Sequence, residues 1–129
     1  MKKLNIVIAI LWFAGFGYCN DLNSAAKRLH KLFDEQFEFS LRENPVFATT
    51  YGDHRFDDKL SQMSMEAIER RNEKAKTFLS ILKSINREEL SQKDKLNYDI
   101  AKKLLEDSIK WNELKPYLMP IDQMGGFYT

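Results

Sequence analysis

Several residue types are scarce in this sequence: one cysteine, two histidines, three prolines and five glycines among 129 residues. A single cysteine excludes an internal disulfide, so the fold has to rest on its apolar core. The two histidines form no His-x-x-x-His pair, which excludes a helical zinc site of that kind. The only adjacent glycines, Gly125 and Gly126, follow no predicted strand and begin no helix, so they form no phosphate-binding loop. So few helix-breaking residues leave room for long helices.

An excess of charge of one sign is also lacking. Without Lys2 and Lys3, 18 basic residues face 19 acidic ones. Basic pairs such as Arg70-Arg71 have acidic neighbours within a turn or two and are typical of solvated helix faces. Nucleic-acid binding needs a clustered basic face, so the charge pattern predicts no nucleic-acid partner.

The first 19 residues have the layout of a secretory signal peptide. Lys2 and Lys3 precede an apolar run over residues 4–18, and polar sequence begins at Asn20. The run is short for a membrane span, and cleavage after Cys19 would place small residues, Gly17 and Cys19, at the positions that a signal peptidase recognises. We therefore expect a secreted or periplasmic protein, with no membrane association after cleavage, in which residues 20–129 form the helical part.

Two alternatives for this segment stay open. The bulky Trp12, Phe13 and Phe16 add hydrophobicity and would suit an uncleaved signal anchor. Cys19 could instead be the acylated cysteine of a bacterial lipoprotein, but Tyr18 stands where such sites have a small residue.

Hydrophobic periodicity predicts an all-α fold with three long helices and a short one. We expect helices over residues 23–43, 45–51, 65–85 and 92–111, with Pro45 at the first position of the second and Gly52 as its left-handed stop. Ser64 and Ser91 are the predicted N-caps of the last two, which should pack as an antiparallel hairpin. The predicted apolar stripes are Ala25, Leu29, Leu32, Phe33, Phe37, Ser40 and Leu41; Ile68, Ala75, Phe78, Leu79, Leu82 and Ile85; and Leu96, Ile100, Leu104 and Trp111, the last flanked by Leu105 and Ile109.

The C-terminal tail, residues 117–129, is expected to be extended, because Pro116 and Pro120 end helical structure. Its side chains are apolar for a solvated segment. We expect that it either folds back on the helices or continues into a longer protein.

Candidate site residues gather in the loop after the second predicted helix: Gly52, Asp53, His54, Arg55 and Asp57. Carboxylates and an imidazole could hold a divalent ion, although the glycine and glutamate of a calcium loop are missing. In the structural alternative, the two aspartates accept hydrogen bonds from turn amides and the arginine pairs with a carboxylate. We keep this stretch as a cleft or structural motif and assign it no catalytic, cofactor-binding or metal role. His30 is predicted to be a surface residue.

Five segments together resemble the domain of unknown function 885 family. They are LFDEQF at 32–37, LRENPVFAT at 41–49, YGDHRFDD at 51–58, LNYD at 96–99, and MPIDQ at 119–123 followed by Gly125-Gly126. The resemblance implies a mostly helical, often exported protein several times longer than this chain. It also implies zinc metallopeptidase chemistry, with a His-Glu-x-x-His-type motif far toward the C-terminus of the family. This chain has no counterpart of that motif, so no catalytic residue is carried over.

The resulting hypothesis is an N-terminal helical fragment of a secreted metallopeptidase-like hydrolase, which helps to form the substrate cleft and is inactive alone. No cofactor is expected in this chain, and zinc is expected in the full-length parent. The expected partners are the remainder of the parent and a peptide substrate. The alternative is a free-standing secreted helical protein that acts by binding a partner, and a third hypothesis, peptidase activity of this chain by itself, is the weakest.

Overall fold

The computed structural model of the protein describes residues 18–118, which contain four α-helices, three short 3-10 turns and no strand. The helices are α2 (Tyr18–Glu43), α3 (Pro45–Thr50), α4 (Met65–Lys83) and α5 (Gln92–Glu113), and the turns are His54–Phe56, Arg87–Glu89 and Pro116–Leu118. The predicted all-α class, with three long helices and a short one, is confirmed. No helix within these residues is long and apolar enough to cross a membrane.

Helix ends follow the capping chemistry of the sequence. Ser64 accepts a hydrogen bond from the N–H of Ala67 and begins α4, and Ser91 accepts one from Asp94 and begins α5, as predicted. Asn44 caps α3, whose first residue is Pro45. Gly52 follows that helix with a φ of +91°, the left-handed conformation that its place at the stop requires.

One predicted helix start was wrong. Helix α2 begins at Tyr18, not at Asn23 or Ser24, and continues through the position of the expected cleavage after Cys19. The physical reason is that neither proline nor glycine occurs between Tyr18 and Glu43, so nothing in the backbone chemistry interrupts the helix there. The expected signal peptide itself lies mostly in residues 1–17, outside the described part.

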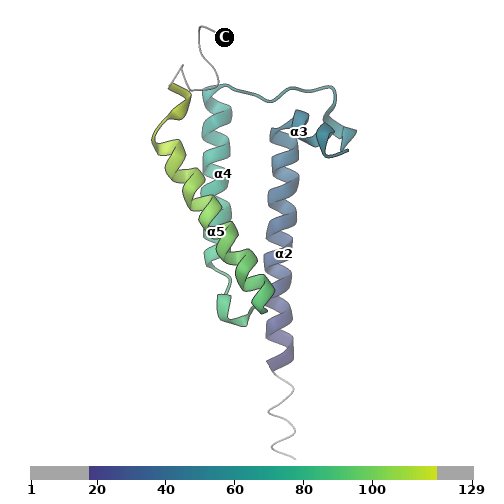
Figure 1. Ribbon diagram of the computed structural model, residues 1–129, viewed down its shortest axis with the longest axis vertical. Helices are drawn as coiled ribbons and strands as arrows, with labels where there is room; N and C mark the ends of the chain where they lie inside the picture. The colour runs from purple at the N-terminus through teal and green to yellow at the C-terminus, as the bar shows by residue number, and fades with distance from the viewer. Residues whose placement is uncertain (1–17, 119–129) are drawn as a thin grey trace, which may run out of the picture.

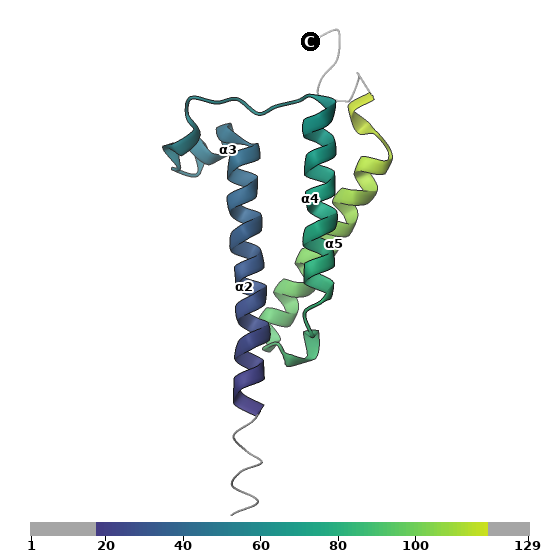
Figure 2. The same ribbon diagram turned by 180° about the vertical axis from the view of Figure 1, so that it is seen from behind.

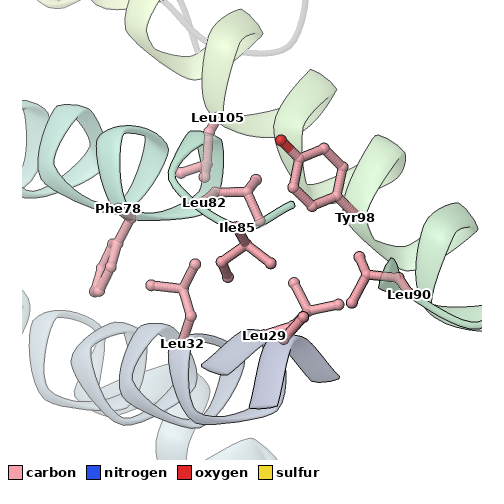
Figure 3. Close-up of a cluster of buried hydrophobic side chains, with 9 residues drawn as sticks. Leu29, Leu32, Phe78, Leu82, Ile85, Leu90, Tyr98 and Leu105 are labelled. Atoms are coloured by element: carbon pink, nitrogen blue, oxygen red, sulfur yellow. The ribbon is translucent and has the colours of Figure 1, made fainter. Parts of the chain in front are cut away.

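The three long helices pack around one apolar cluster. In Figures 1 and 2, α4 and α5 form the predicted antiparallel hairpin, with α5 crossing α4 at an angle, and α2 runs alongside it. Figure 3 shows side chains from all three helices and from the α4–α5 connection converging on this core. Its buried members are Ala25, Leu29, Leu32, Phe78, Leu82, Ile85, Leu90, Tyr98 and Leu105.

The predicted buried face of α5 was wrong. Leu96, Ile100, Leu104 and Trp111 are 60%, 49%, 63% and 59% exposed, whereas Tyr98 and Leu105 are buried. Helix α5 carries apolar side chains on two faces, and periodicity alone cannot say which of them meets α2 and α4. The face that packs against α2 and α4 contains Leu105, which the sequence pattern placed only beside the predicted stripe.

The expected extended tail is corrected at its beginning. Lys115 adopts a positive φ of 50° after α5, and Pro116–Leu118 then form a 3-10 turn. Proline suits the first position of a helical turn, which is why residues 117 and 118 are not extended. The remainder of the predicted tail, residues 119–129, lies outside the described residues.

Candidate functional site

The loop between α3 and α4 is built around Arg55. Asp53 caps the first 3-10 turn by accepting the N–H of Arg55 at 3.1 Å, and the same carboxylate accepts the guanidinium Nε at 2.9 Å. Nη2 of Arg55 also reaches both carboxylate oxygens of Glu38 on α2, each at 3.1 Å. Hydrogen bonds from Asp53 and then Glu38 raise the pKa of Arg55 above its usual range. Arg55 therefore anchors the loop to α2.

A second set of hydrogen bonds orients His54. Its Nδ1 lies 2.8 Å from Oδ2 of Asp57, and Oγ1 of Thr49 donates to the other oxygen of that carboxylate at 2.6 Å. Bonds from Thr49 and then His54 lower the pKa of Asp57. The His54 side chain is 70% exposed, and engagement of Nδ1 leaves Nε2 as the ring nitrogen for a further group.

The loop geometry agrees with part of the structural interpretation. Asp53 accepts the turn amide and Arg55 pairs with carboxylates as predicted, but Asp57 bonds side chains and not a backbone amide. Within residues 18–118, no three His, Cys, Asp or Glu side chains are grouped so that they could hold a metal ion. His30, the other histidine, lies on the surface, with its Nε2 3.3 Å from Asp94.

Acidification is expected to weaken the Asp53–Arg55 anchor below about pH 4. Hydrogen bonds from Arg55 lower the pKa of Asp53 in the fold. Such a carboxyl group stabilises the fold at pH values above the pKa that it has in the unfolded chain. This contribution disappears as the pH falls through the lower pKa that it has in the fold. The melting temperature of Asp53→Asn should therefore lie below that of the unchanged protein near neutral pH, and the difference should shrink below about pH 4.

The effect should be small, because solvent screens ion pairs at a surface. Asp58→Asn is the matched control, since Asp58 takes no part in these hydrogen bonds. A melting difference for Asp53→Asn that stays constant with pH would contradict the ionic account.

A groove opens between the C-terminal halves of α2 and α5, the middle of α4 and the loop that precedes α4. Its volume is about 430 Å³, and its lining residues are Gln36, Phe39, Ser40, Glu43, Asn44, Ser61, Met63, Arg71, Ala75, Phe78, Leu104, Leu105 and Ser108. At its rim, the carboxylate of Glu43 accepts hydrogen bonds from Nη2 of Arg70 at 2.8 Å and from Nη1 of Arg71 at 3.5 Å. Oδ1 of Asn44 accepts a hydrogen bond from the hydroxyl of Ser61 at 3.1 Å, and this bond holds the loop beside the groove.

No pattern in the sequence predicted the groove. Its walls come from three helices far apart in the chain, so no local pattern could define it. Arg70-Arg71 was interpreted as a solvated face, whereas both arginines reach across to α2.

An aromatic cluster occupies the surface where α2 meets α3. The ring centroid of Tyr51 lies 5.3 Å from that of Phe37 and 5.6 Å from that of Phe47. Phe37, predicted as part of the apolar stripe, is 40% exposed and packs against Tyr51 and not in the main core.

These features define an all-α protein that leaves an apolar helix face and a groove uncovered by its described residues. The family model described as "Bacterial protein of unknown function (DUF885)" matches residues 45–129, and the chain belongs to this family of domain of unknown function 885 proteins. The match includes the segments at 51–58, 96–99 and 119–123, whereas 32–37 precedes it. No curated protein and no solved structure matches the chain.

Proposed function

We propose that this chain is the N-terminal helical portion of a longer, exported metallopeptidase-like protein, in which it helps to form the substrate cleft. The observation that carries the proposal is the exposed face of α5. Leu96, Ile100 and Trp111 follow helical spacing on the side of α5 away from the buried Tyr98 and Leu105. The exposed Leu104 lies at the edge of this face and also lines the groove. A helix that is apolar on two sides belongs inside a larger helical assembly.

The peptidase part of the proposal rests on the resemblance of the five segments to the family. The catalytic zinc and its ligands would lie in the remainder of the longer protein. In this chain, His54 and Arg55 are exposed polar side chains held in place by Asp57, Asp53 and Glu38. Side chains fixed in this way are suited to contact a peptide substrate, because little freedom is lost on binding. Their role would be binding and not catalysis.

Export would be directed by residues 1–19 and accompanied by their removal. Mass measurement of the product recovered outside the cytoplasm tests this, since cleavage after Cys19 leaves Asn20 as the first residue. A product that keeps Lys2 and Lys3 would favour the signal anchor, and a lipid-modified Cys19 would favour the lipoprotein.

The test of the main proposal is a peptide-library assay with added zinc on this chain and on a longer family protein that includes the zinc motif. We expect chelator-sensitive cleavage by the longer protein and none by the chain alone. In the longer protein, His54→Gln should raise KM with a melting temperature close to that of the Asp58→Asn control. Chelator-sensitive cleavage by the pure chain would refute the assignment of the metal site to the remainder.

The alternative function is partner binding by a free-standing secreted protein. The exposed cluster of Phe37, Phe47 and Tyr51 favours it, because aromatic side chains are enriched at protein interfaces. In that case the isolated chain would be monomeric, unfold cooperatively and bind little hydrophobic dye.

A further inference from the structure

A second pocket, distinct from the groove, has mainly basic side chains in its walls. It opens where α2 ends and α3 begins, beside the loop that leads to α4 and the first turns of α4, and its volume is about 340 Å³. In Figures 1 and 2 this is the end of the bundle where α2 ends and α4 begins. Arg42, Lys59 and Arg70 line the pocket, and Glu43 is the one carboxylate among its described lining residues. Three cations and one anion therefore share this small volume.

The carboxylate in the pocket is already bound to arginine. Oε1 of Glu43 accepts a hydrogen bond from Nε of Arg70 at 3.2 Å, and Oε2 accepts one from Nη2 of the same guanidinium at 2.8 Å. Oε2 also accepts a weaker bond from Nη1 of Arg71 at 3.5 Å. One carboxylate that faces two guanidinium groups leaves an excess of positive charge in and around the pocket.

Arg42 and Lys59 keep their charged donors for another group. The carboxylate of Glu38, one helical turn before Arg42, is bound by Arg55, and Nε of Arg42 donates only to the backbone carbonyl of Glu38, at 3.4 Å. Nζ of Lys59 lies 5.6 Å from the ring centroid of Phe56. Within residues 18–118, neither Arg42 nor Lys59 forms an ion pair with a carboxylate. Both cations are therefore available to a ligand.

We propose that this pocket binds an oxyanion, the carboxylate or phosphate group of a small ligand. A guanidinium presents parallel N–H donors that match either group, and the ammonium of Lys59 adds a second charge. Like charges close together repel, so an anion between Arg42 and Lys59 is stabilised by both. The Arg70 guanidinium is fixed by its two bonds to Glu43, so little of its freedom is lost on binding. This inference goes beyond the proposed function and does not depend on it.

The surroundings of the pocket favour a small anion over a polyanion. Its volume lies at the lower end of the range for ligand sites. Asp34, Glu35 and Glu38 line the neighbouring hollow on the other side of Arg42. A nucleic acid needs an extended row of cations for its phosphates, and here it would meet these carboxylates instead.

Titration of the full chain with inorganic phosphate and, separately, with glutarate tests the proposal. The amide signals of the pocket residues and the Nε–H signals of Arg42 and Arg70 are followed by NMR at constant ionic strength, so that general screening does not change. We expect saturable shifts with a Kd of about 1 mM or below for at least one anion. Saturation by phosphate alone would support a phosphate site, and saturation by glutarate alone a carboxylate site. No saturable shift with either anion would overturn the proposal.

The double variant Arg42→Gln and Lys59→Gln should weaken binding about tenfold, because two charged donors are lost. The matched control is Lys93→Gln with Lys110→Gln, which removes the same charge from two exposed residues of α5 that do not line the pocket. The control should weaken binding less than about twofold, since exposed charges at a distance are screened. Equal losses in the two double variants would mean that net charge and not the pocket attracts the anion, and would overturn the proposal.

Lys59→Gln alone keeps the test decisive if the double variant fails to fold. Lys59 lies on the exposed loop before α4, where a substitution leaves the helices intact. We expect binding about threefold weaker, with an unchanged circular dichroism spectrum. Unchanged affinity of this variant for both anions would contradict the assignment of Lys59 to the site.

Discussion

Replacing Leu82 with alanine is expected to lower the free energy of unfolding by about 2–5 kcal/mol. Leu82 is fully buried in the cluster where α2, α4 and α5 meet, which also contains Leu29 and Ile85 (Figure 3). Truncation removes apolar atoms from the core and leaves a cavity that the surrounding helices fill only in part. Because small domains are stable by only about 5–15 kcal/mol, a loss of this size is a large share of the total. Urea unfolding followed by circular dichroism measures it.

Leu96→Ala is the matched control on α5. The chemical change is the same, but Leu96 is 60% exposed, and alanine is at least as good a helix former as leucine. We expect a change within about 0.5 kcal/mol. Equal losses for the two variants would mean that Leu96 is covered in solution and would contradict the exposed face of α5.

Replacing Ile100 with lysine is expected to have little effect on the stability of this chain but a large effect on the folding of the longer protein. In this chain, the half-exposed site lets the lysine stem lie along the helix with its ammonium in water, so the free energy of unfolding should change by less than about 1 kcal/mol. Dye binding and self-association should fall, because the exposed apolar patch is interrupted. In the longer protein, the same ammonium would be buried at the contact with the remainder. An unpaired buried charge costs several kcal/mol, so that protein should lose most of its folded yield.

Ser80→Lys provides the comparison, since it adds the same charge at an exposed position of α4. It should be tolerated in both proteins. If Ile100→Lys were tolerated equally well in the longer protein, the face of α5 would not be an internal contact, and the proposed function would lose its main support.

The sequence predicted most of the fold because its helix boundaries depend on local chemistry. Ser64, Ser91, Pro45 and Gly52 act on backbone groups within a few residues, so their effects can be recognised without tertiary information. The face of α5 could not be assigned in the same way. Both faces are apolar, and the choice between them depends on how α2 and α4 are placed.

The contacts of the candidate loop also separate into local ones, which the sequence predicts, and distant ones, which it does not. The bond from the Arg55 amide to Asp53 spans two residues and was expected from turn chemistry. The contact of Arg55 with Glu38 joins a loop to a helix across seventeen positions, and no local pattern contains it. The groove depends entirely on such distant contacts, and for this reason no local sequence pattern predicts it.

The arrangement of the core also sets an order of events during synthesis. Of the described helices, α2 emerges from the ribosome first, but the partners of its buried Leu29 and Leu32 lie in residues 78–105. The hairpin of α4 and α5 closes a much shorter loop and should form before α2 docks on it. Until then the apolar stripe of α2 stays exposed, so the nascent chain presents a binding site for a chaperone during that interval.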